Sequence, residues 1–171
     1  LTMSQKEVQN EPCGGLVIDK PNGMTSHDIV NRVRRLYNTK RVGHAGTLDP
    51  MATGVLVVML GGATRFIELL PTHKKAYRAT FRLGIKTDTL DIWGAVLEES
   101  KKTASPSQVA ELLPQFKGKI KQVPPMYSAL KVNGQKLYDL ARKGREVERQ
   151  PRTITIHKLE CLEFAGNTAR L

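Results

Sequence analysis

Glycines, a histidine and an aspartate, residue types that often build catalytic or binding sites, lie close together in one segment, from Gly43 to Gly54. Its glycines allow tight backbone turns and the close approach of a ligand. The segment also holds His44 and Asp49. A carboxylate can act as nucleophile or base, and an imidazole as hydrogen-bond donor or stacking ring. Spacing alone leaves structural alternatives open, because Asp before Pro often only starts a turn and a His can be a buried, hydrogen-bonded ring.

Two flanking elements are predicted to hold this segment in place. Before it, residues 15–19 predict a short buried strand, and Ser26 is a good N-cap for a helix. The apolar face of that helix carries Ile29, Val30, Val33, Leu36 and Tyr37, and its basic face carries Arg32, Arg34 and Arg35. After the segment, residues 55–60 predict a second buried strand. We therefore expect a loop at residues 42–53, between a basic helix and a buried strand.

The rest of the chain mixes strands and helices. The predicted helices lie at 63–70, 105–116 and 135–143, and the predicted strands or extended stretches at 76–85, 93–98, 119–132, 153–164 and 168–171. Ser105, followed by Pro106 and Gln108, is typical of a capping box. Because the order lacks strict βαβ alternation, we predict an α+β fold, with a mixed, mainly antiparallel sheet and flanking helices.

Charge gives the first indication of a partner. The chain of 171 residues has 27 Lys and Arg against 16 Asp and Glu, a net charge of +11. A field of that sign attracts polyanions such as nucleic acid. The alternative is that the charge serves only solubility. An anionic membrane is not favoured, because no basic amphipathic helix with large apolar anchors stands out.

Composition narrows the class of protein further. The longest apolar run, residues 55–60, is too short to span a bilayer, and no secretion signal is recognisable. Cys13 and Cys161 are expected to be free thiols in a reducing cytoplasm, and no Cys and His cluster has metal-ligand spacing, so no metal is expected. Residues 1–12 are polar and lack periodicity, which predicts a flexible tail before a core at 13–171.

Six ordered segments resemble the motifs of TruB-type pseudouridine synthases. Two of them resemble the signature motifs of that family, at residues 19–26 and 43–56. The others resemble its Lys-x-Tyr segment, its Thr-Asp-Thr-x-Asp segment and its RNA-gripping insertion; they lie at residues 75–77, 87–91, 122–131 and 137–144. The resemblance covers about residues 14–165, and agreement across six motifs is far more specific than any one of them.

The resemblance implies a pseudouridine synthase fold and the isomerisation of uridine to pseudouridine in the T-loop of tRNA, at position 55, without cofactor or metal. Asp49 matches the catalytic aspartate of the family. Tyr77 matches the ring that stacks on the flipped-out uracil, and His44 the residue that fills the vacated space or braces the loop. Lys20 could contact a phosphate or pair with an acidic neighbour. The insertion at about 123–152 implies RNA contacts from Tyr127, Lys131 and Arg142.

One departure from the family pattern bears on the site. In the family, a later strand supplies an Arg that pairs with the catalytic aspartate, and Arg170 does not match that motif. The C-terminal strands are therefore expected to be missing from this chain, and the C-terminal part of the same protein to complete the site, with no other obligate protein partner. Two rival functions remain: a non-catalytic RNA-binding or RNA-folding module, and a metal-dependent nucleic-acid enzyme. Asp88 and Asp91 come closest to the ligands the second rival needs, but lie about forty residues from Asp49.

Overall fold

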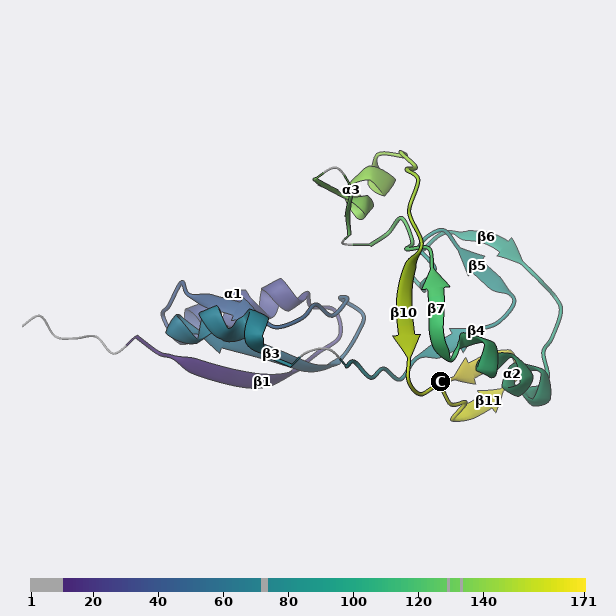
Figure 1. The fold of residues 1–171 in the computed structure, drawn as a ribbon, viewed down its shortest axis with the longest axis horizontal. Coiled ribbons are helices and arrows are strands. Elements are labelled where there is room, and N and C mark those ends of the chain that lie inside the picture. Colours follow the sequence, from purple (N-terminus) through teal and green to yellow (C-terminus); the bar gives the residue numbers. More distant parts are fainter. Residues whose placement is uncertain (1–10, 72–73, 129, 133) are drawn as a thin grey trace, which may run out of the picture. The chain divides into compact units, whose positions relative to one another are not determined.

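The chain forms two compact units, Leu1–Ala76 and Tyr77–Leu171, each described here by itself (Figure 1). The computed structural model describes residues 11–71, 74–128, 130–132 and 134–171, without the side chains of Lys131 and Lys136. The flexible tail predicted at 1–12 therefore lies almost wholly outside the described residues.

The first unit is a small antiparallel sheet with one helix packed on it. Its strands are β1 (Gly14–Lys20), β2 (Val42–His44) and β3 (Gly54–Leu60), in the order β1-β3-β2, with Gly14 opposite Leu60 and Lys20 opposite Gly54. The helices are α1 (Ser26–Leu36) and the 3₁₀ helix η1 (Gly61–Leu69). The core consists of Ile29, Val30, Val33, Val42, Leu56, Val58 and Leu60. The sheet and α1 thus enclose one apolar layer, as the helix pattern predicted.

Three details of this unit differ from the prediction. The strand β3 is buried on one face only, since Leu56 is 2% exposed and Val55 70% exposed. Successive side chains of a strand point to opposite faces, so a continuous apolar run does not by itself show burial on both. The apolar face of α1 ends at Val33, because Leu36 is 80% exposed. The N-cap of α1 is Thr25 rather than Ser26.

The second unit is built from short antiparallel ladders. Its strands are β4 (Thr80–Arg82), β5 (Ile85–Thr87), β6 (Val96–Glu99), β7 (Gly118–Gln122), β8 (Lys131–Val132), β9 (Gln135–Lys136), β10 (Arg152–Ile156), β11 (Glu163–Ala165) and β12 (Thr168–Arg170). They pair as β10-β7, β11-β12-β4, β5-β6 and β8-β9, all antiparallel. The helices are α2 (Pro106–Leu112), η2 (Leu113–Phe116) and α3 (Leu137–Arg142). The α+β class with antiparallel pairing is thereby confirmed.

The stretch predicted as one strand at 76–85 contains β4 and the start of β5, which have different partners. β4 pairs with β12 from the far end of the chain, and β5 pairs with β6. Gly84, at φ +85°, separates β4 from β5 and lets the chain turn between them. The helix predicted at 63–70 is the 3₁₀ helix η1. Among the described residues, no helix is long and apolar enough to cross a membrane.

Candidate active site

Asp49 lies exposed in the loop that joins β2 to β3, called here the Asp49 loop (residues 45–53). It starts a turn in which the Ala52 amide donates to the Asp49 carbonyl oxygen at 3.0 Å. Its carboxylate has no hydrogen-bond or ion-pair partner within the described part of the chain. Both oxygens are therefore available to a substrate, while the backbone behind them is held in a turn.

Lys20 is hydrogen-bonded to the backbone of this loop. It is the last residue of β1 and is 0% exposed. Its ammonium donates to three carbonyl oxygens: Pro21 at 2.9 Å, Met24 at 2.6 Å and Pro50 at 3.3 Å. Three carbonyl acceptors replace the water that a buried ammonium loses. The contacts join the turn after β1 to the residue that follows Asp49.

Two further ties fix the same loop. The Gly23 amide donates to the Pro50 carbonyl oxygen at 2.9 Å. Ser26, buried at the start of α1, accepts from the Leu48 amide at 3.0 Å and donates to the Leu48 carbonyl oxygen at 3.3 Å. The residues on both sides of Asp49 are thus bonded to the segment at 20–26. Sequence reasoning missed this use of Ser26, because a Ser next to a helix start reads first as an N-cap.

His44 ends β2, and its ring lies beside the loop. Its Nδ1 is within hydrogen-bonding distance of the Gly46 carbonyl oxygen, so Nδ1 carries the proton and donates. The ring is partly buried. This contact holds the imidazole in one orientation. The structure thus brings Lys20, His44 and Asp49 together in one unit.

The remaining predicted site residues belong to the second unit. Tyr77 lies ahead of β4 and is 66% exposed, as an aromatic ring that stacks on a base must be. In the insertion, Tyr127 is 38% exposed, and the Arg142 guanidinium lies 5.4 Å from the centre of the Tyr138 ring. The side chain of Lys131 lies outside the described residues.

The Thr-Asp-Thr-x-Asp segment folds into a tight loop between β5 and β6. Asp91 Oδ1 accepts from the Thr89 hydroxyl at 2.7 Å and from the Trp93 amide at 2.9 Å. Asp88 Oδ1 accepts from the Ala95 amide at 2.8 Å. A Cβ at Gly94 would approach Thr89 Oγ1 to 2.3 Å, so a larger residue there would displace the side chains that brace the loop. Both carboxylates, which the metal-dependent rival would use, thus brace their own loop, and no group of three His, Cys, Asp or Glu in the described residues could hold a metal ion.

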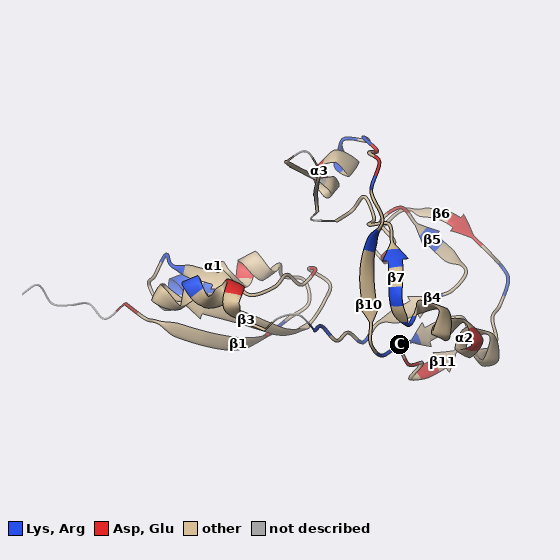
Figure 2. Cartoon of the chain, in the orientation of Figure 1, with Lys and Arg blue, Asp and Glu red and all other residues tan. Residues whose placement is uncertain are grey.

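Basic residues lie on α1 (Figure 2), and they differ in exposure and in hydrogen bonding. Arg32 and Arg35 are exposed. Arg34 instead turns toward the protein, where its guanidinium donates to Asn31 Oδ1 at 3.2 Å and to the Val42 carbonyl oxygen at 3.3 Å. Of the three arginines on the basic face of this helix, Arg32 and Arg35 are therefore the ones exposed enough to contact a polyanion.

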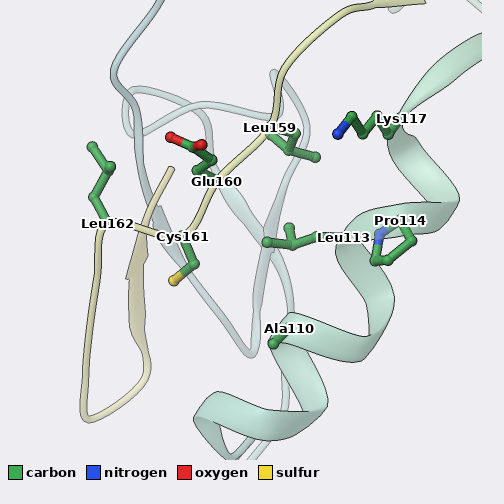
Figure 3. A pocket seen from close by; sticks show the side chains of 8 residues that line it. All are labelled: Ala110, Leu113, Pro114, Lys117, Leu159, Glu160, Cys161 and Leu162. Carbon is green, nitrogen blue, oxygen red and sulfur yellow. The ribbon is translucent and has the colours of Figure 1, made fainter.

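The second unit also contains an open groove (Figure 3). It runs between the α2–η2 segment and the stretch before β11, and it is lined by Ala110, Leu113, Pro114, Lys117, Leu159, Glu160, Cys161 and Leu162. Its lining is mostly apolar and includes none of the predicted site residues.

Comparisons with known proteins agree on one family. Residues 34–171 match the TruB family pseudouridylate synthase (N terminal domain). The chain is 52% identical over 151 residues to tRNA pseudouridine synthase B of Alkaliphilus oremlandii, covering 88% of this chain and 50% of that protein. It is 46% identical over 169 residues to tRNA pseudouridine synthase B of Dechloromonas aromatica, covering 99% and 56%. The chain thus spans about half the length of these curated relatives.

Solved structures show the same fold. The chain matches one chain of a Cbf5-Nop10-Gar1 complex with a TM-score of 0.65 and 29% identity, over 92% of this chain and 37% of that chain. It matches one chain of an H/ACA RNP bound to a substrate RNA containing 2'-deoxyuridine with a TM-score of 0.63 and 25% identity, over 92% and 36%.

Proposed function

Because this chain belongs to the TruB family of pseudouridylate synthases, as its motifs predicted, we propose that it supplies the catalytic aspartate for the isomerisation of uridine to pseudouridine in tRNA. The target proposed is the T-loop uridine at position 55, which the motif resemblance implied. The substrate is tRNA, and the reaction needs no cofactor.

The single observation that carries the proposal is the setting of Asp49. Its carboxylate is exposed and without a partner in the described residues, while the residues on both sides of it are bonded to the segment at 20–26. Such an arrangement suits a reactive group, because the group is held in place and its oxygens remain available for a substrate.

The isomerisation breaks the bond between C1′ and N1 of the uridine and forms one between C1′ and C5. A carboxylate can assist either by adding to C1′ as uracil leaves or by taking a proton from the sugar. The C5 proton is then lost, N1 gains a proton in place of its bond to C1′, and a proton taken from the sugar is returned to it, so that the product is an isomer of uridine. Both routes place the Asp49 carboxylate against the ribose, so the uridine must leave its stack to reach it.

The other site residues receive supporting roles. Tyr77 is proposed to stack on the flipped uracil, and His44 to brace the loop or fill the space that the base leaves. Tyr127, Lys131 and Arg142 are proposed to contact RNA from the insertion. Lys20 changes role: since it has no exposed atom to offer a phosphate, we assign it to positioning the Asp49 loop instead of contacting RNA.

The test is Asp49→Asn, in the chain joined to the C-terminal remainder of the Alkaliphilus relative. Asn keeps the shape and the turn-forming tendency of Asp but removes the charge. We expect the isomerisation rate to fall by a factor on the order of a thousand or more, about 4 kcal/mol at ~1.4 kcal/mol per tenfold. Binding of tRNA and thermal stability should change little, because the loss lies in the transition state. Single-turnover tritium release with matched binding data measures both.

Glu111→Gln provides the charge-matched control, since Glu111 is exposed on α2. It should leave the rate unchanged. Near-normal turnover of Asp49→Asn would remove Asp49 from the mechanism. If the joined protein binds tRNA without any turnover, the non-catalytic RNA-binding alternative is correct.

A further inference from the structure

The ribbon formed by β7 and β10 has two unlike faces. Ile120, Ile154 and Ile156 point to one face and are partly buried. The other face is exposed and consists of Lys119, Lys121, Thr153 and Thr155. In the register of the ribbon, Lys119 lies opposite Thr155 and Lys121 opposite Thr153. We call this exposed surface the lysine face.

The lysine face has a positive charge that no acidic residue of the ribbon offsets. Among the ten residues of the ribbon, Lys119 and Lys121 are the basic residues on this face, Arg152 lies on the other, and none of the ten is acidic (Figure 2). Neither lysine takes part in an ion pair in the described part of the chain, whereas other exposed basic residues, such as Lys86 and Lys158, are paired with Glu98 and Glu160. The two ammonium groups are therefore free to attract an anion.

We propose that the lysine face binds the phosphate backbone of the RNA substrate, an inference that rests on the proposed function. Residues two apart on a strand project from the same face about 6.8 Å apart, at ~3.4 Å per residue. This spacing is of the same order as that between neighbouring phosphates of one RNA strand. The short hydroxyl side chains of Thr153 and Thr155 leave the lysines unobstructed and are themselves donors to phosphate oxygens.

The position of the ribbon in the chain supports RNA over other anions. β7 leads into the insertion at 123–152 and β10 leaves it, with Gln122 opposite Arg152 where the two meet. Arg152 also donates to Gln122 Oε1 at 3.4 Å. An RNA strand that contacts Tyr127 and Arg142 in the insertion can thus continue onto the lysine face. The RNA interface is thereby extended beyond the residues that sequence motifs indicate.

The test compares two double variants of the 171-residue chain. Lys119→Thr with Lys121→Thr removes the lysine face and keeps residues that favour strands. Lys101→Thr with Lys102→Thr removes the same charge from an exposed segment ahead of α2. Binding of a tRNA transcript is measured across a salt series, with circular dichroism to check folding. Each phosphate contact that is lost should make the plot of log affinity against log salt concentration less steep, by about 0.7–0.9 in the magnitude of its slope.

For the lysine-face variant, the magnitude of this slope should fall by about 1.4–1.8, twice the effect of one contact. For the Lys101→Thr, Lys102→Thr control it should stay unchanged. Equal slopes for the two variants would overturn the proposal and assign the lysines to solubility or to protection of an exposed strand. A difference seen with phosphatidylserine vesicles but not with tRNA would overturn it in favour of a membrane. The proposed function is tested by a different experiment: near-normal turnover of the Asp49→Asn protein would contradict it and would leave the result for the lysine face unaffected.

Discussion

Lys20 shows how one buried residue can fix the position of an exposed loop. A lysine with no exposed surface is rare, since burial of an unpaired charge is costly. Here the charge is stabilised by the carbonyl oxygens of Pro21, Met24 and Pro50, which belong to two separate turns. The attraction that stabilises the ammonium therefore also keeps the two turns together and sets the position of Asp49.

Lys20→Met should destabilise the fold. Met has a similar length but no donor, so the Met24 and Pro21 carbonyl oxygens lose this partner, while Pro50 keeps the bond from the Gly23 amide. We expect a loss of about 1–3 kcal/mol in the free energy of unfolding, measured by urea denaturation. The control is Lys86→Met, which removes an exposed pair with Glu98 and should change the value by less than about 0.5 kcal/mol. Equal stability of the two variants would contradict the positioning role.

Among the elements, α1 carries the link between the sheet and the Asp49 loop. Thr25 caps it, accepting from the Asp28 amide at 3.0 Å and donating its hydroxyl to Asp28 Oδ2 at 2.6 Å. The next residue, Ser26, bonds Leu48. The hydroxyl and amide of Thr25 lower the pKa of Asp28 below its usual 3.8. Loss of this N-cap should therefore destabilise α1 and also disturb the Asp49 loop.

Thr25→Ala should reduce stability at neutral pH by about 0.5–2 kcal/mol through loss of the N-cap. Because the pKa of Asp28 is lower in the folded protein than in the unfolded one, its contribution is present above pH 3.8 and is lost as the pH falls through the folded pKa. The cost of Thr25→Ala should accordingly shrink in acid. Ser105→Ala, at the equivalent cap of α2 with the non-titrating Gln108, should have a pH-independent cost. Parallel pH profiles of unfolding for the two variants would contradict this account.

Local patterns predicted the elements well and their partners less well. The Ser105 capping box was predicted correctly because all of its atoms lie within four residues. The apolar face of α1 was predicted as far as Val33, whereas Leu36 required knowledge of where the sheet ends. The pairing of β4 with β12 joins residues more than eighty positions apart, and no local signal encodes it. Likewise, Asp49 could be singled out from its motif, but the burial of Lys20 could not.

On the scale of the whole molecule, the length of the relatives sets an expectation for activity. The chain corresponds to 50–56% of the two curated proteins compared above. We expect the isolated chain to turn over little, and addition of the C-terminal remainder of the Alkaliphilus relative, fused or as a separate peptide, to raise the rate. The physical reason is the arginine that the family pattern places opposite the catalytic aspartate, which would hold Asp49 ionised and oriented.

The rate of tritium release, measured with and without the added segment, tests this expectation. The control is the Asp49→Asn chain with the same segment, which should stay inactive. Full turnover by the isolated chain would show that no partner for Asp49 is needed from outside it.

The two cysteines have a consequence for spectroscopy. Both thiols are exposed and free, with Cys13 in the first unit and Cys161 in the second. With a nitroxide spin label on each thiol, double electron–electron resonance would measure the distance between the two units without any substitution in the sequence. Since Asp49 and the insertion belong to different units, tRNA that contacts both should change the distribution of label distances. The same change should occur with Asp49→Asn, and a distribution that tRNA leaves unchanged would count against a substrate that bridges the units.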